Sequence, residues 1–189
     1  MKRQLFAIVV LALVTGAVGF NTVIRPAGDA TFDTITCNMW KVVDADGKTR
    51  VDAGTRADGS VRVTWFDKDG NERIGAGTIA DGHASVTWFD KDLKKRIAAS
   101  TLADGDASVS WFDKDGKERM VASTLADGDA SVAWLDKDEK VRINAVTFAD
   151  GTAGVAWLDK DEKVRINAAT LPDGTVVLPT EDLNPQKKP

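Results

Sequence analysis

Tryptophan recurs at a fixed interval along most of this chain of 189 residues. Trp40 stands twenty-five positions before the second tryptophan, and each later one follows after twenty-three. The evenly spaced tryptophans are Trp65, Trp88, Trp111, Trp134 and Trp157. A fixed period of this length is typical of a repeat protein, in which each unit is one small structural element stacked against its neighbours. The period therefore constrains the architecture of the chain more than its chemistry.

Each unit contains two short strand-like runs, for example ASVTWFD in residues 84–90 and RIAAST in residues 96–101. Two Asp-rich turns separate these runs. Two strands and two turns within one such period are the spacing of an all-β chain. We therefore predict a β-hairpin repeat domain of about six two-stranded units over residues 32–178.

The two turns of each unit differ in their use of glycine. The second turn keeps Asp-Gly in all six units, which predicts a residue with positive φ there. The first turn keeps Asp-x-Asp but replaces its glycine by Leu93, Glu139 and Glu162. A left-handed residue is thus predicted to be helpful in the first turn and not obligatory, in a loop built on a type I turn.

An arginine follows each evenly spaced tryptophan by eight positions. If the Asp-x-Asp loop folds as a three-residue hairpin with a bulge, Asp90 faces Lys94 and Trp88 faces Arg96. The guanidinium would then lie on the indole and contribute about 0.5–1 kcal/mol at an exposed site. The arginines are Arg73, Arg96, Arg119, Arg142 and Arg165. They would also keep an apolar sheet soluble.

Two arrangements fit two strands per unit: an antiparallel meander of hairpins, or a β-solenoid with parallel stacked coils. In a solenoid, equivalent lysines and aspartates would lie about 4.8 Å apart, and each like pair would cost about 0.9 kcal/mol in water. The cost is about 0.4 kcal/mol at the roughly 9.6 Å spacing of a meander. This difference and the Asp-Gly hairpin signal favour the meander, with the solenoid as the alternative.

Alternation along the strands places Val86 and Trp88 on one face of the sheet and Thr87 and Phe89 on the other. Trp and Val then lie on one face, and Phe or Leu with Ile on the other. A flat single layer would leave an apolar surface exposed to water. We therefore expect the sheet to coil, to close on itself, or to associate with another copy through an apolar face.

The chain begins with Lys2 and Arg3 and an apolar run over residues 5–20, which is typical of an export signal. Residues 1–20 are predicted to be a cleaved signal peptide or, as the alternative, an apolar helix that anchors the chain in the membrane. Residues 21–31 would form a spacer, and the proline-containing residues 179–189 a disordered tail. The repeats would lie outside the cytoplasm, in the periplasm, on the membrane or outside the cell.

Charge and cysteine content narrow the classes of partner. The formal charge of −4 disfavours a nucleic-acid partner, because an acidic surface repels phosphate backbones. The single cysteine, Cys37, cannot form a disulfide within the chain, and we expect it to be a half-buried strand residue in preference to an intermolecular disulfide.

The segments VVDADGKTR, WFDKDGNERI and WFDKDGKERM are similar to the short Asp-Lys-Asp-Gly-Lys repeats of exported bacterial proteins of unassigned function. The similarity covers residues 32–178 and implies a hairpin repeat without implying an activity. A weaker likeness is to MORN-type hairpin repeats, which share the unit length, Trp and Asp-Gly. The Gly-x-Gly and Tyr elements of that pattern are missing here, so its membrane or partner roles do not carry over.

Two sets of residues are candidates for binding. The Asp-x-Asp turns offer oxygen ligands that Ca²⁺ prefers, although aspartate is also the expected residue of a hairpin turn. These weak metal candidates are Asp67, Asp69, Asp90, Asp92, Asp113 and Asp115. The row Trp65, Trp88, Trp111, Trp134 and Trp157 could stack on a polysaccharide or an extended partner, with packing under arginine as the simpler interpretation.

No catalytic residues or cofactor are predicted. The single histidine, His83, takes the place of Ser, Asp or Thr in the other units, as a surface turn substitution would. Six nearly identical units suit a scaffold better than catalysis, which needs one asymmetric cluster of groups. We therefore expect a non-enzymatic structural or binding module exported to the cell envelope or exterior, with a calcium- or polysaccharide-binding surface as the alternative.

Overall fold

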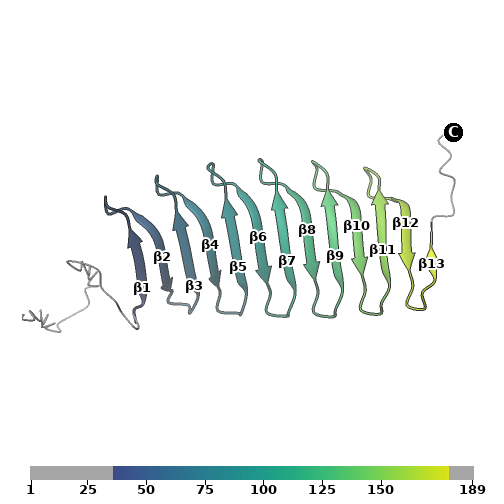
Figure 1. The fold of residues 1–189 in the computed structure, drawn as a ribbon, viewed down its shortest axis with the longest axis horizontal. Coiled ribbons are helices and arrows are strands. Elements are labelled where there is room, and N and C mark those ends of the chain that lie inside the picture. Colours follow the sequence, from purple (N-terminus) through teal and green to yellow (C-terminus); the bar gives the residue numbers. More distant parts are fainter. Residues whose placement is uncertain (1–35, 179–189) are drawn as a thin grey trace, which may run out of the picture. The chain divides into compact units, whose positions relative to one another are not determined.

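The computed structural model describes residues 36–178, which form thirteen β-strands in a single sheet. The strands are β1 (Met39–Val43), β2 (Thr49–Thr55), β3 (Val61–Phe66), β4 (Glu72–Thr78), β5 (Ala84–Phe89), β6 (Lys95–Thr101), β7 (Ala107–Phe112), β8 (Glu118–Thr124), β9 (Ala130–Leu135), β10 (Val141–Thr147), β11 (Ala153–Leu158), β12 (Val164–Thr170) and β13 (Val176–Val177). Figure 1 shows them side by side in sequence order. The all-β prediction is confirmed.

Each strand pairs antiparallel with its sequence neighbours, of which β1 and β13 at the two ends of the described sheet have one each. This confirms the meander and excludes the solenoid, which would require parallel neighbours. Within residues 36–178 strands contact only their sequence neighbours, so the described sheet is open and does not close on itself.

The first turn of each unit joins the two strands of one predicted hairpin. In the third hairpin the Asp90 amide donates to the Lys94 carbonyl at 2.9 Å, and the Leu93 amide donates to the Asp90 carbonyl at 3.1 Å. These bonds define a type I turn followed by one left-handed residue, as predicted.

The predicted register fails one step beyond the turn. Phe89 pairs with Lys95, but Trp88 pairs with Ile97, because Arg96 is an extra residue that forms a bulge between them. The prediction that Trp88 faces Arg96 is therefore wrong. A shift of one residue moves side chains to the other face, so Ile97 shares the tryptophan face and not the phenylalanine face.

The second turns have the same backbone as the first turns. The Ile79 amide donates to the His83 carbonyl at 2.9 Å, and Gly82 occupies the left-handed position with φ 96°. The predicted positive φ is thus confirmed at every Asp-Gly. In the first turns the left-handed residue was predicted to be optional, and this is wrong: Leu93, Glu139 and Glu162 adopt φ of 59–60° there. The type I turn of three-residue hairpins requires that conformation whatever the side chain.

The sheet has no second layer among the described residues. Ala133, at 9% exposure, is the one buried apolar residue there, and the buried polar residues are Ser60 and Thr64. Domains ordinarily bury an apolar face of a sheet against another layer. Apart from Ala133, the described apolar side chains of both faces remain half-buried or exposed, and the open sheet does not meet the expectation of closure.

Some predictions concern residues outside the described range. The signal or anchor at residues 1–20, the spacer at 21–31 and the disordered tail at 179–189 all lie there. Within residues 36–178 no helix has the length and apolar character required to cross a membrane. Cys37 lies just before β1 and is exposed, so the prediction of a half-buried strand residue is wrong.

Candidate functional site

The largest candidate surface is the face that carries Trp65, Trp88, Trp111, Trp134 and Trp157, which we call the indole face. The strand register gives it three rows that run across the strands. Trp alternates with Ile or Met beside the first turns, and Val alternates with Ala in the middle. Thr alternates with Ala or Val beside the second turns. None of these strand residues is charged.

A groove of about 1270 Å³ runs along the indole face from β3 to β11. Its floor consists of the small residues of the middle and second-turn rows, such as Ala99, Thr101 and Val109. The taller Trp and Ile side chains occupy the neighbouring row. The small side chains of these two rows thus form the floor of the groove, and the large side chains of the Trp row form its border.

The tryptophans of the indole face are partly open to solvent. Trp65 is 38% exposed, Trp134 40% and Trp157 39%. Trp111 is half-buried. Trp40 does not join their row: it pairs with Ala53, two positions away from the row, because the first unit has two extra residues before Asp44. Val42 takes its place opposite Val51.

The arginines do not lie on the indoles. Among the described residues the one cation–π contact places the Lys95 Nζ 5.0 Å from the centre of the Phe112 ring, on the face opposite the indoles. The predicted Arg–Trp stacking is therefore wrong, and the bulge explains it, since Arg96 has no partner position opposite Trp88.

Each of these arginines instead pairs with the first aspartate of its own turn. Arg73 Nη2 lies 2.5 Å from Asp67 Oδ2, while its Nη1 donates to the backbone carbonyl of Asp90 in the next first turn. Arg50 and Arg119 make the same two contacts, and Arg96 lies 3.8 Å from the Asp90 carboxylate. We call this contact between successive first turns the arginine bridge. Sequence reasoning found the arginine period but assigned it the wrong partner.

The first aspartate of each first turn is held by the turn itself. In Asp159, Oδ1 accepts from the amides of Lys163 and Asp161 at 3.1 and 2.8 Å, and Oδ2 accepts from Arg165. The Lys163 amide contributes most to lowering the pKa of Asp159 to about 2, against a partial burial that raises it. The pKa values of Asp67 and Asp113 are lowered to about 2 in the same surroundings.

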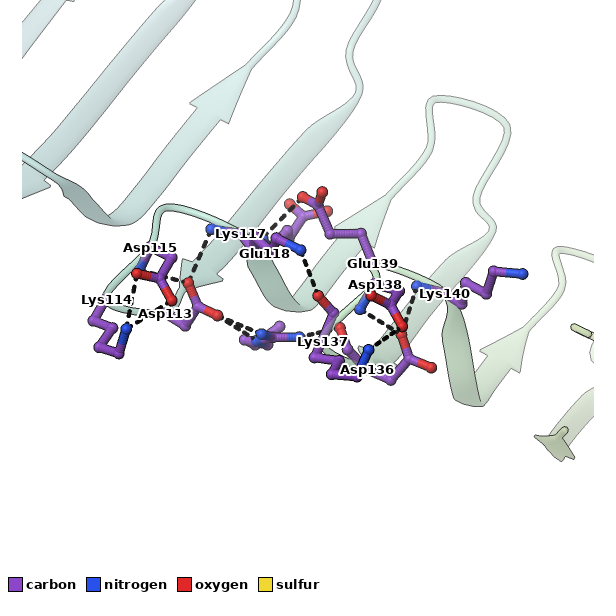
Figure 2. A network of polar contacts seen from close by, with 11 residues as sticks. Asp113, Lys114, Asp115, Lys117, Glu118, Asp136, Lys137, Asp138, Glu139 and Lys140 are labelled. Atoms are coloured by element: carbon purple, nitrogen blue, oxygen red, sulfur yellow. Dashed lines mark hydrogen bonds and ion pairs between the residues drawn. The ribbon is translucent and has the colours of Figure 1, made fainter. Parts of the chain in front are cut away.

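The second aspartate of the first turn lies outside this arrangement. Asp115 accepts from Lys114 at 2.8 Å at the exposed tip of the turn. Figure 2 shows Asp113 and Asp115 with separate partners, and the corresponding Asp136 and Asp138 beside them. Among residues 36–178 no three acidic, histidine or cysteine side chains gather as a metal site would require.

Figure 2 also shows how neighbouring first turns are linked by side chains. Lys117 Nζ donates to the Lys137 carbonyl at 2.8 Å, and the Glu118 amide donates to Glu139 Oε1 at 3.2 Å. Glu139 thus contributes to the link although it occupies a left-handed position. Together with the arginine bridges of Arg50, Arg73 and Arg119, these contacts join several units to the next one along the chain.

The opposite face has one asymmetric feature. Arg62 on β3 pairs with Glu72 on β4 at 2.5 Å, beside a smaller pocket of about 370 Å³ that His83 also lines. Gly75 makes room for this pair, since a Cβ there would clash with Glu72 Oε1. His83 lies in the second turn with its Nε2 3.8 Å from Asp81.

Comparison with known proteins gives likenesses among solved structures alone. No protein-family model matches the chain, and no curated protein matches it. Among solved structures, the SAS-4 (dCPAP) TCP domain of Drosophila melanogaster, in complex with a proline-rich motif of Ana2 (dSTIL), matches with a TM-score of 0.33 and 14% sequence identity. The match covers 80% of this chain and 96% of that one. A likeness at this level carries no argument about function.

Proposed function

We propose that this chain is a non-enzymatic structural or binding module that is exported to the cell envelope or exterior. The observation that carries the proposal is the indole face: one uncharged surface repeated across the whole described sheet. A surface of identical rows offers the same contact many times over. Catalysis requires a different arrangement, in which a nucleophile, an acid or base and a stabilising group converge once.

The arginine bridges support the same function. At Arg50, Arg73 and Arg119 they link one first turn to the next without using the indole face. In a sheet without a buried core, such lateral contacts add to the backbone ladder and the turns that set the strand register. The first turns therefore stabilise the module, and the side chains of the indole face remain available for contact with a partner.

Export is tested by the state of the N-terminus and by accessibility. Mass spectrometry of the native protein should find either a new N-terminus near residue 20 or the intact apolar segment in a membrane fraction. Protease added to cells with a permeabilised outer layer should then digest the repeats. Recovery of the intact chain in the protease-protected cytoplasm would contradict the proposal.

A polysaccharide is the second candidate partner, and the exposure of the indoles favours it. Trp65, Trp134 and Trp157 each leave more than a third of their surface open, as stacking on a sugar ring requires. Acrylamide should quench their fluorescence, and a bound glycan should protect them. A glycan array is the direct measurement. Trp134→Ala should then weaken binding, whereas Leu135→Ala on the opposite face is the matched control.

Calcium binding, the other alternative, has less support from the geometry. Both oxygens of Asp113 already accept hydrogen bonds, from the amides of Lys117 and Asp115 and from Arg119. A calcium ion at this turn would have to displace the arginine. Titration to millimolar Ca²⁺, followed by tryptophan fluorescence and melting temperature, separates the cases: a shift that Arg119→Ala enhances would support a calcium site.

A further inference from the structure

The indole face is an unpartnered apolar surface, and we propose that a second copy of this chain covers it. The two sheets would pack face to face about a two-fold axis that runs across the strands. Each strand then lies over the same strand of the second copy in the reverse direction. This inference goes beyond the proposed function, since it assigns the occupant of the face and the orientation in which it binds.

The size of the face is sufficient for a stable dimer. Thirteen strands at a spacing of about 4.8 Å extend about 58 Å, and six-residue strands extend about 20 Å. The product is about 1,200 Å² on each copy, compared with the roughly 800 Å² per partner of a standard protein–protein interface. All of this strand surface is uncharged, which is a property of interface cores.

Steric fit selects the orientation. Interiors pack at the density of organic crystals, so large side chains must face small ones. With the axis across the strands, the Trp row of one copy lies over the Ala and Thr row of the other and fills its groove. With the axis along the strands, Trp88 would meet another Trp row while Ala84 and Thr101 faced small residues across an empty channel.

Charge selects the same orientation. The six second turns, residues 56–60, 79–83, 102–106, 125–129, 148–152 and 171–175, hold eight aspartates and one arginine, a formal charge of −7. The first turns with the two residues after each hold seventeen basic and sixteen acidic residues, a formal charge of +1. An axis across the strands places the acidic row beside the neutral one, whereas an axis along the strands would align two acidic rows.

The opposite face is a poorer interface. Lys41, Asp52, Lys95 and the Arg62–Glu72 pair place charges on it, and Lys95 covers the Phe112 ring. Burying these groups against a second sheet would remove their water without new partners, which is unfavourable. The dimer therefore forms through the indole face alone.

The first test is the mass of the chain, as it is recovered from cells, across a concentration series by analytical ultracentrifugation. We expect a dimer. Ala99→Glu, in the groove on β6, should raise the dissociation constant at least tenfold, because it buries a carboxylate without a partner. Ala98→Glu is the matched control on the same strand and the other face. A monomer at all concentrations, or equal effects of the two variants, would overturn the proposal.

The second test reads the orientation. Ala168→Cys, on the indole face of β12, is combined with Cys37→Ser and treated with a short bis-maleimide. In the proposed dimer the two introduced thiols lie across the interface, at about the 10 Å spacing of stacked sheets, and should crosslink. With the axis along the strands they would lie some ten strand spacings, about 48 Å, apart.

Ala169→Cys with Cys37→Ser is the matched control for that crosslink, on the outer face of β12. A dimer that crosslinks at neither position, or at both equally, would refute the orientation. The protein could instead be a monomer whose indoles are protected from acrylamide quenching only when a glycan is added. That result would show that the indole face binds the sugar, and it would contradict the dimer. Since export is measured separately by the N-terminus and protease accessibility, the two proposals fail independently.

Discussion

The two rows of turns share one backbone conformation but secure it by different means. In the first turns side chains hold the loop: an aspartate accepts from two turn amides, and an arginine bridge reaches the next turn. In the second turns the aspartate before glycine accepts from one turn amide, as Asp81 does from His83, and glycine holds the left-handed position in all six. Some second turns are also linked to the next one, since Asp106 accepts from the Ala126 amide and Asp129 from the Ala149 amide. A first turn, whose aspartate accepts from two amides of the turn, tolerates Leu93 or Glu139 where a second turn with one such bond keeps glycine.

The left-handed angle also varies among the turns: first-turn glycines have φ of 79–86° and second-turn glycines φ of 83–102°. The non-glycine residues of the first turns have φ of 59–60°, within the left-handed well that L-residues can occupy. Gly105 and Gly128 of the second turns have φ of 102° and 99°, well outside it. A Cβ on Gly128 would also lie 3.3 Å from the Cβ of Ala149 in the next second turn. Dihedral angle and space both exclude a side chain there.

Acid should produce the largest effect, because it disables all first turns together. The folded pKa values of Asp67, Asp113 and Asp159 are about 2, below the ordinary 3.8. A group with a lowered folded pKa contributes stability that is complete above its unfolded pKa and is lost as pH falls toward the folded value. We expect the melting temperature to be level above about pH 5 and to fall steeply between about pH 4 and pH 2.

Circular dichroism melts across this pH range are the measurement for the acid effect. ¹³C NMR of the aspartate carboxyls should assign the lowest titrations to the first aspartate of each first turn. A melting temperature that stays level down to pH 2 would mean that the turn bonds do not favour the ionised carboxylate.

The largest single substitution should fall in a second turn. Gly128→Ala should lower the free energy of unfolding by about 2 kcal/mol, because alanine is strained at φ 99° and its Cβ meets Ala149. Gly116→Ala, in the adjacent first turn at φ 81° with nothing near its Cβ, should cost about half as much. Urea unfolding of both variants compares the rows directly, and equal losses would remove the distinction between them.

Removing an arginine bridge should come next. Arg119→Ala removes the arginine donor from the Asp136 carbonyl and from Asp113 Oδ2, at a cost of about 1 kcal/mol for this partly exposed group. The control is Lys114→Ala in the same turn, whose 82% exposed side chain pairs only with its neighbour and whose loss should not be measurable. Matching urea midpoints for the two variants would show that the bridge contributes nothing.

The features that repeat in every unit were predictable from the sequence. One Trp in every regular unit and Asp-Gly at every second turn are local signals with one physical interpretation each, and they indicated the all-β meander and its turns. The position of Arg96 in a bulge was not predictable in this way, because an extra residue in a strand has no composition signal of its own. Because of this extra residue, Ile97 lies on the indole face, and the Arg96 side chain lies near the first turn and not opposite Trp88.

The candidate site was predicted in composition but not in geometry. The tryptophan row was foreseen, whereas the groove beside it depends on which of Ala98 and Ala99 shares the face of Trp88, and so on the bulge. The partners of Asp113 were missed for a similar reason: an aspartate in a turn has the same sequence signature whether it binds a metal, a backbone amide or an arginine.

The smallest expected effect is a gain in stability in a first turn. Leu93→Gly relieves a left-handed φ of 59° and removes a side chain that is 52% exposed, so the free energy of unfolding should rise by about 0.5 kcal/mol. The gain is limited because glycine also loses more backbone entropy on folding. Glu139→Gly has the same backbone change but loses the contact of Glu139 with the Glu118 amide, so it should gain less. If Leu93→Gly destabilises the chain, the side chain contributes contacts that outweigh the backbone strain, and the tolerance of the first turns would have to be explained by packing instead of anchoring.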